Sequence, residues 1–107
     1  EADLEDADLR GSELTNAFLQ GANLRGSDLR DASLRGARLS GVNLSNAVLD
    51  GATLTRAELR GADLSGAILR DARLEGADLT GANIEGADLR GARMVLEGTV
   101  GTPAYRP

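Results

Sequence analysis

A large aliphatic residue stands at every fifth position from Leu4 to Met94, and this period constrains the fold more than any other feature. Seventeen of these nineteen residues are Leu, and the other two are Ile84 and Met94. The residue two positions earlier is Ala in sixteen cases, and the residue two positions later is Gly in twelve. Residues 1–95 therefore repeat the unit Ala-x-Leu-x-Gly.

A period of five fits neither of the regular secondary structures. On a helix, successive Leu side chains would spiral around the axis and form no apolar stripe. On a straight strand, side chains five positions apart would point to opposite faces. The period is satisfied if the chain turns a corner every five residues, always in the same sense. The Leu and the small residue two positions before it then face inward together, and the residue between them faces outward.

The residue at each corner supports this interpretation. Gly, Asp and Asn tolerate a positive φ, which the third position of a type II turn requires. These three residue types occupy every corner position except Arg56 before the pattern stops at Leu96. We therefore predict that the corner at Arg56 uses a different turn geometry.

A second period of twenty residues gives the number of sides. Gly recurs at 21, 41, 61 and 81, and an Asp or Asn column runs through 3, 23, 43, 63 and 83. A spacing of fifteen produces no such columns. The sequence thus predicts an all-β solenoid with four sides per coil and just under five coils.

The last segment, residues 96–107, has no period and contains Pro103 and Pro107. Proline suits an edge cover or a linker because it cannot donate a backbone hydrogen bond. We predict a β-helical domain over residues 1–95 and an irregular tail over residues 96–107 that acts as a cap or a linker. In that tail, Leu96, Val100 and Tyr105 are the side chains expected to fold over the last coil.

Individual units of this chain resemble the repeat of pentapeptide-repeat proteins. Examples are Ala-Asn-Leu-Arg-Gly at residues 22–26 and Ala-Asp-Leu-Thr-Gly at residues 77–81. The resemblance implies a right-handed quadrilateral β-helix. Members of this family are numerous in bacteria, especially cyanobacteria, and also occur in chloroplast compartments. The best understood members bind DNA gyrase as dimeric mimics of duplex DNA. This chain lacks the inserted loop that some of those members have and the apolar C-terminal segment through which they dimerise.

The composition offers few chemical groups for catalysis. The chain has no His, Lys or Cys, so a hydroxyl nucleophile would have only carboxylates as bases. We predict no enzymatic activity, no catalytic residue, no cofactor and no small-molecule substrate. The Asp and Asn column could supply oxygen ligands to Ca²⁺. Ligands spread along a rod do not converge on one point, however, and these residues suit turn hydrogen bonds, so no metal site is predicted.

The net charge of −5 is concentrated at one end of the chain. Five acids precede the first Arg: Glu1, Asp3, Glu5, Asp6 and Asp8. From Leu9 onward, twelve acids balance twelve Arg residues. A neutral surface of mixed sign argues against direct nucleic-acid binding. No apolar run reaches the length that membrane insertion requires, so we expect a soluble protein, with the cytoplasm favoured over a chloroplast or thylakoid compartment.

Three outward positions carry apolar side chains instead of polar ones. Phe18 is the only apolar outward residue on its side. Val48 and Ile68 are twenty residues apart and should touch, forming a small patch flanked by Asp28 and Asp88. The patch either stabilises its side locally or forms the centre of a partner interface. Phe18, Val48 and Ile68 are therefore the candidate partner contacts.

Two functions remain compatible with the sequence. The first is a structural or protein–protein interaction module within a larger assembly, with an unidentified protein partner and with self-association through its sides as a further option. The alternative is a DNA mimic that binds DNA gyrase or another type II topoisomerase. The charge balance and the uninterrupted repeat favour the first function.

Overall fold

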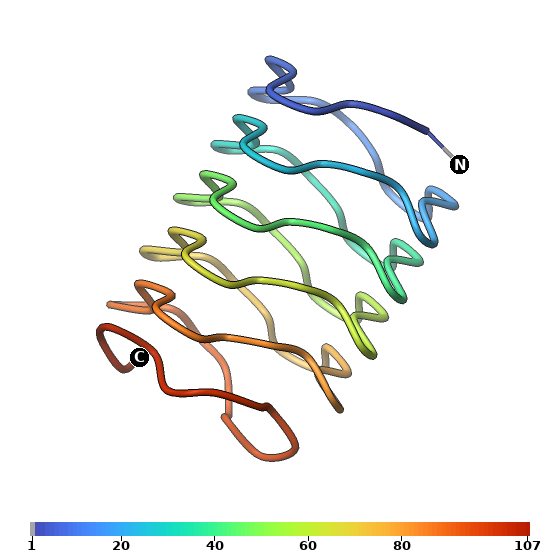
Figure 1. The fold of residues 1–107 in the computed structure, drawn as a ribbon. Helices are drawn as coiled ribbons and strands as arrows, with labels where there is room; N and C mark the ends of the chain where they lie inside the picture. The colour runs from blue at the N-terminus through green and yellow to red at the C-terminus, as the bar shows by residue number, and fades with distance from the viewer. Residues whose placement is uncertain (1) are drawn as a thin grey trace.

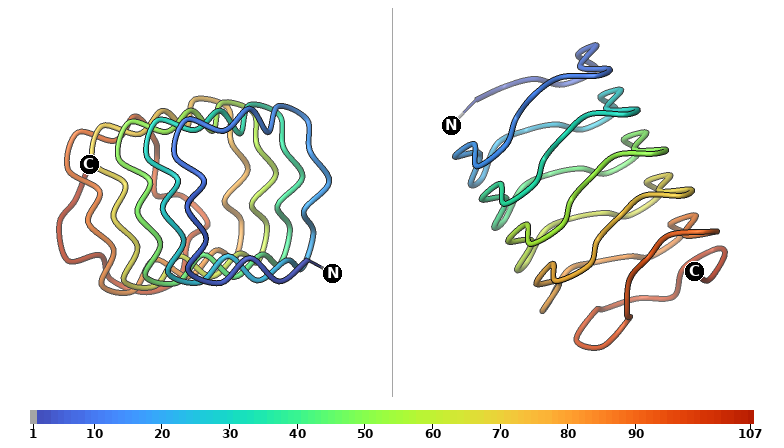
Figure 2. Two further views of the ribbon diagram at one scale, coloured as in Figure 1. Left: turned by 90° about the horizontal axis from the view of Figure 1, so that it is seen from above. Right: turned by 180° about the vertical axis from the view of Figure 1, so that it is seen from behind.

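The chain winds into a stack of four-sided coils, as the ribbon in Figure 1 shows. This computed structural model describes residues 2–107. Glu1, one member of the predicted acidic cluster, lies outside the described residues. Viewed from above, the successive coils follow one another side by side as equivalent turns of one solenoid (Figure 2).

The coils are joined by parallel bridges between residues of neighbouring coils. Fifteen bridges link residues twenty positions apart, from Asp3–Asn23 to Arg73–Arg93. This spacing confirms the prediction of four sides. The flat runs are so short that residues 2–107 contain no helix and no extended strand, only single bridged residues. We number the sides by their bridged residues: side 1 (3, 23, 43, 63, 83), side 2 (8, 28, 48, 68, 88), side 3 (13, 33, 53, 73, 93) and side 4 (18, 38, 58, 78).

The interior is filled by the repeated Leu and by the small residue two positions before each Leu. The central leucines, such as Leu44 and Leu54, are completely buried, as is Ala52 between them. The four leucines of the first coil are only partly buried because no coil covers them; they are Leu4, Leu9, Leu14 and Leu19. The corner residues are mostly exposed and the outward residues are exposed or half-buried, in keeping with the inward-outward alternation.

Each corner is a turn closed by a backbone hydrogen bond from the small residue to the preceding Leu carbonyl, as between Ala47 N–H and Leu44 C=O at 3.1 Å. The third residue of the turn has a positive φ throughout the repeat, as a type II turn requires. The prediction of a different geometry at Arg56 is wrong, because its φ of 61° matches the 67° of Gly61. The ladder imposes this geometry: Arg56 N–H donates to Glu75 C=O at 2.9 Å like every other corner amide in the inner coils.

The tail continues over the last coil in a shortened register. Val100 bridges Asn83 on side 1, and Tyr105 bridges Asp88 on side 2, each over seventeen residues instead of twenty. The missing three residues fall between Arg93 and Val100, where the chain shortens the fourth side of the fifth coil. The whole molecule measures 27 × 23 × 21 Å, so the stack is hardly longer than it is wide.

Candidate interaction face

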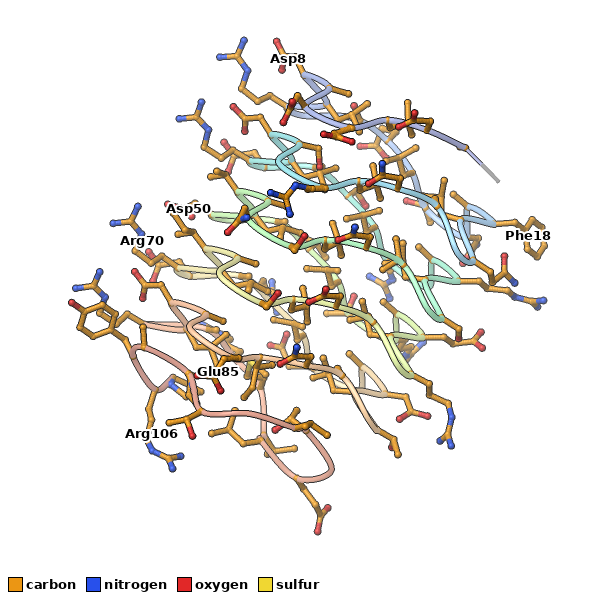
Figure 3. The ribbon with its side chains drawn as sticks, in the orientation of Figure 1. Asp8, Phe18, Asp50, Arg70, Glu85 and Arg106 are labelled. Carbon is orange, nitrogen blue, oxygen red and sulfur yellow. The ribbon has the colours of Figure 1, made fainter. Side chains whose placement is uncertain are left out.

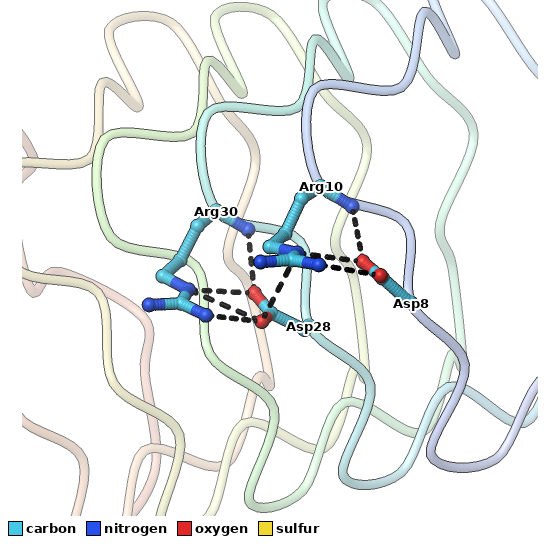
Figure 4. Close-up of polar contacts among 4 residues, drawn as sticks. All are labelled: Asp8, Arg10, Asp28 and Arg30. Carbon is cyan, nitrogen blue, oxygen red and sulfur yellow. Dashed lines mark hydrogen bonds and ion pairs between the residues drawn. The ribbon is translucent and has the colours of Figure 1, made fainter.

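Side 2 carries a repeated Asp-x-Arg unit in which the outward Asp binds the Arg at the following corner. In the first coil, Asp8 accepts hydrogen bonds from Arg10 Nε at 2.8 Å and Nη2 at 2.7 Å. The same bidentate pair forms between Asp28 and Arg30 in the next coil (Figure 4). Two parallel bonds hold the guanidinium plane in one orientation, so each coil with this unit presents an ordered charge pair.

The charge pairs of neighbouring coils also approach one another. Arg10 Nε lies 3.8 Å from Asp28 Oδ2, and Arg70 Nε lies 3.8 Å from Asp88 Oδ2. These two contacts join neighbouring coils. The shorter bonds of the Asp-x-Arg unit join an Asp to the Arg two positions later, because both side chains belong to the same coil. The result is a line of alternating charge along side 2, in which ion pairs join the first two coils to each other and the last three coils to one another.

The Arg partners lower the pKa of the carboxyl groups on this line. The side-chain hydrogen bond from Arg10 is the largest contribution to lowering the pKa of Asp8 to about 2. The Arg30 and Arg90 side chains likewise lower the pKa of Asp28 and Asp88. The carboxylates therefore stay ionised, and each remains bound to its Arg, well below neutral pH.

The two middle coils break the unit. Val48 and Ile68 occupy the positions that Asp holds in the other coils, and Asp50 occupies a position that Arg holds elsewhere. Asp50 Oδ2 lies 3.2 Å from Arg70 Nε in the next coil (Figure 3). Asp50 thus replaces the carboxylate that Ile68 fails to supply, and the line of charge continues around an apolar centre.

Val48 and Ile68 are directly bridged on neighbouring coils and are both half-buried. Their adjacency follows the predicted spacing of twenty, and their partial exposure leaves an apolar surface between the charge pairs. On this side, Asp28 also accepts a hydrogen bond from the backbone N–H of Arg30 at 3.2 Å. A Val or Ile side chain cannot accept such a bond, so the apolar centre forgoes a local stabilising contact.

Phe18 lies apart from this centre. It projects from side 4, the side opposite side 2, and 70% of its surface is exposed (Figure 3). The guanidinium of Arg38 lies over its ring, 4.8 Å from the centroid. The structure therefore places Val48 and Ile68 together and Phe18 elsewhere, and the role of all three in partner binding stays a prediction.

Side 1 uses its Asp and Asn column for turn hydrogen bonds. Asp63 Oδ1 accepts from the backbone N–H of Ser65 at 2.9 Å, and Asn43 Oδ1 accepts from that of Ser45 at 3.0 Å. The remaining members, Asp3, Asn23 and Asn83, bind the N–H two positions later in the same way. This confirms the hydrogen-bonding interpretation of the column. Within residues 2–107, no three acidic side chains come close enough to share a metal ion.

One residue of side 2 was not identified from the sequence as part of this face. Tyr105 reaches side 2 through its bridge to Asp88, and Arg90 lies over its ring, 4.0 Å from the centroid. About half of Tyr105 is exposed. No pattern signals this position, because the tail is displaced by three residues from the repeat. With Tyr105 included, side 2 is a flat face of paired charges with an apolar centre and an aromatic end.

The corner every five residues and the bridges between residues twenty apart define a four-sided β-solenoid. Comparison with known proteins then gives the family. The family model described as pentapeptide repeats matches eight copies, over residues 1–31, 32–71 and 57–94. The chain belongs to the pentapeptide-repeat family, and its coil is the right-handed quadrilateral β-helix of that family. Among curated protein sequences, none matches the chain.

Several solved structures are similar to this protein. Rfr23, a pentapeptide repeat protein from the cyanobacterium Cyanothece 51142, is 32% identical with a TM-score of 0.66 over 80% of this chain and 65% of its own. A pentapeptide repeat protein from Nostoc PCC 7120 is 42% identical with a TM-score of 0.48 over 81% and 64%. One from the Arabidopsis thaliana thylakoid lumen is 32% identical with a TM-score of 0.49 over 83% and 66%.

The chain spans less than two thirds of the length of each of these three relatives. Over the described residues 2–107, the fold includes no helix that could cross a bilayer.

Proposed function

We propose that this protein is a non-catalytic module that binds a partner protein through side 2, as a structural or interaction subunit of a larger assembly. The observation that supports this proposal is the apolar pair Val48–Ile68 in the middle of a line of charges that are paired within the chain. The ion pair between Asp50 and Arg70 balances the charge of Arg70, so the surroundings of Val48 and Ile68 stay neutral.

The arrangement resembles the general anatomy of a protein interface. Such interfaces have an apolar centre, a polar rim and an enrichment in Arg and Tyr. On side 2, Val48 and Ile68 would be the centre, and Arg30, Arg90 and Tyr105 would belong to the rim. Because each Arg is already bound to a carboxylate, a partner would meet ordered side chains and would lose little side-chain entropy on binding.

The test is an affinity capture from an extract of the source cell with two matched variants. Ile68→Gln replaces the apolar centre, and Glu58→Gln places the same side chain on the opposite side. We expect the wild type and Glu58→Gln to retain the same partner at salt concentrations of about 0.1 M and about 1 M, since apolar contact is little screened. Ile68→Gln should retain at least about tenfold less, a difference of about 1.4 kcal/mol in binding.

Circular dichroism melts of the three proteins provide the folding control. Equal capture of one partner by all three proteins would contradict the proposal. Salt-sensitive capture of a type II topoisomerase, with inhibition of its supercoiling activity, would replace it by the DNA-mimic function. The acidic first coil, with Asp3, Glu5, Asp6 and Asp8, would then be the surface to mutate.

A further inference from the structure

The first coil leaves the backbone groups of its outer edge unpaired. In the inner coils, an outward residue such as Thr53 donates to Ala32 C=O at 3.0 Å and accepts from Leu34 N–H at 2.7 Å, both in the coil before it. In the first coil, the equivalent N–H and C=O groups of Asp8 and Glu13 have no hydrogen-bond partner among residues 2–107. The leucines of this coil are also only partly buried. An unpaired ladder edge above an open core is a template for another chain.

The opposite end of the solenoid presents the complementary groups on side 3. Gly91 N–H, Ala92 C=O and Met94 N–H have no hydrogen-bond partner within the described part of the chain. One coil earlier, the equivalent groups bind the coil that follows at 3.0, 2.9 and 3.0 Å. The first coil of a second copy, stacked here with the spacing of twenty residues, would supply all three missing partners from its residues 10–13.

The tail already takes the place of a sixth coil on sides 1 and 2. Val100 N–H donates to Ala82 C=O at 2.8 Å, and Leu89 N–H donates to Tyr105 C=O at 2.9 Å. Before it reaches side 1, the tail also passes over the end of side 4, where Gly98 C=O accepts from a corner amide at 2.7 Å. A second copy can therefore bind across this end only after displacing the tail.

The charges of the two ends favour stacking of unlike ends. The first coil, residues 2–20, carries five acids and one Arg, whereas the last coil and the tail together carry three of each. Two first coils would therefore repel each other, and a first coil on a last coil would not. Side 3 adds an attractive pair, because Arg93 would face Glu13 of the second copy as Arg38 faces Glu58 at 3.6 Å in the inner coils.

Side 2 adds a second attractive pair at a position that the tail now covers. In the inner coils, Arg70 Nε lies 3.8 Å from Asp88 Oδ2 of the coil that follows. In the stack, Arg90 would face Asp8 of the second copy in the same way. The guanidinium of Arg90 now lies over the Tyr105 ring instead, 4.0 Å from the centroid. The tail and a second copy therefore compete for the same side chain.

We propose that the C-terminal end of the solenoid binds the first coil of a second copy of this chain, stacked head to tail, and that the tail blocks this site as an intramolecular competitor. A tethered competitor acts at an effective concentration of about 1 mM, so the intact chain stays monomeric at micromolar concentration. Contacts between unlike ends do not close on themselves and lead to linear assemblies. One like-charged pair, Glu5 with Glu85, would meet at an exposed corner, where salt screens it. The contact does not involve Val48 and Ile68, so this proposal and the proposed function can fail independently.

The first test displaces the tail by substitution in the full chain. Gly101 has a φ of 91°, and a Cβ on it would lie 2.9 Å from Glu85 N, so Gly101→Val should detach the tail. Thr102→Pro should do the same by removing the N–H that donates to Glu85 Oε1 at 2.9 Å. In sedimentation velocity, both variants should associate at least about tenfold more tightly than the wild type. Arg106→Val, at an exposed position of the tail, is the control and should stay monomeric.

A charge exchange tests the head-to-tail geometry. In the Gly101→Val background, Glu13→Arg and Arg93→Glu should each associate at least about tenfold more weakly, because each places like charges across the contact. An equimolar mixture of the two should recover association, since every contact between one variant and the other is then attractive. Ile68→Gln in the same background should leave association unchanged.

Circular dichroism melts are the folding control, and association is compared among variants that melt cooperatively. Gly101→Val and Thr102→Pro proteins that both stay monomeric would overturn the proposal. Association that Glu13→Arg leaves unchanged, or a mixture that associates no better than its two components, would also overturn it.

Discussion

At the scale of single residues, the corners follow a rule that joins one coil to the next. Six corners carry a side chain at a positive φ, and in every case the corner twenty residues later is Gly; the six are Asp6, Asn16, Asp31, Asn46, Arg56 and Asp71. A Cβ on Gly66 would overlap Asn46 Oδ1, whereas a Cβ on Gly61 would meet nothing within 4 Å. At five of the six, the corner side chain thus occupies the space that a Cβ at the next corner would need; the exception is Gly76, where a Cβ would only touch Arg56 Cγ at 3.4 Å.

This rule predicts different costs for the same substitution at neighbouring corners. Gly61→Ala and Gly66→Ala share a φ near 67°, so both should lose about 1–2 kcal/mol to left-handed strain. Gly66→Ala should lose more, because it also meets Asn46. In urea denaturation, the double variant Asn46→Gly/Gly66→Ala should recover that extra loss. Equal unfolding free energies for the two single variants would refute the rule.

Arg56 offers a stabilising change at the same scale. Its φ of 61° is one that Asn tolerates better than Arg, because the short amide can form local hydrogen bonds. We expect Arg56→Asn to raise the free energy of unfolding by up to about 1 kcal/mol. Arg35→Asn, at an ordinary corner position, is the control and should change it by less than about 0.5 kcal/mol. A loss of stability at Arg56→Asn would show that its long side chain packs favourably on the neighbouring coil.

At the scale of the element, the structural unit is the column of equivalent residues in successive coils, and not any one coil. Side 2 shows how such a column tolerates exceptions: Ile68 removes a carboxylate, and Asp50 supplies one from the neighbouring coil at 3.2 Å from Arg70. The ion pairs of a column are therefore coupled, and a fall in pH should weaken them together.

The pH dependence of stability follows from the direction of the pKa shifts. Asp8, Asp28 and Asp88 have folded-state pKa values below the ordinary 3.8 of Asp. Their contribution to stability is complete above that value and is lost as the pH falls toward the folded value, about 2 for Asp8. Urea midpoints should therefore decrease between about pH 4 and about pH 2.

A neutral substitution isolates this contribution. Asp88→Asn keeps an oxygen that can accept from the backbone N–H of Arg90 but removes the charge that binds its guanidinium. Its urea midpoint should depend less on pH over that range than the wild-type midpoint. Thr53→Asn, which changes no carboxyl group, should retain the wild-type dependence. An unchanged pH slope in Asp88→Asn would exclude Asp88 as a contributor.

At the scale of the whole molecule, stability is shared by neighbouring coils, each of which completes the core of the next. Every coil repeats the same cross-section, and contacts run mainly to the coils above and below, as in other solenoids. The ends are the exceptions: the leucines of the first coil are only partly buried, and the tail covers two sides of the last. Damage at the centre should therefore affect both halves.

Leu54→Asp tests this dependence. Leu54 is completely buried in the third coil, and an unpaired carboxylate there has no hydrogen-bond partner. The loss should approach the whole stability of a domain, about 5–15 kcal/mol, so the variant should lack the far-ultraviolet circular dichroism of the folded protein. Thr53→Asp puts the same side chain on the outward position next to it and should melt like the wild type. Coincident melts of the two variants would contradict the inward position of Leu54.

Much of this protein follows from the sequence alone. The period of five determines the corners and the inward Leu, and the period of twenty determines the four sides and the adjacency of Val48 and Ile68. Both are properties of a repeat, and a repeat needs no knowledge of distant contacts. Only the tertiary structure decided the exceptions. The ladder imposed an ordinary corner on Arg56, and the shortened register of the tail brought Tyr105 to side 2 and left the end of side 3 unpaired. These features depend on which residues meet across coils, and no local pattern specifies that register.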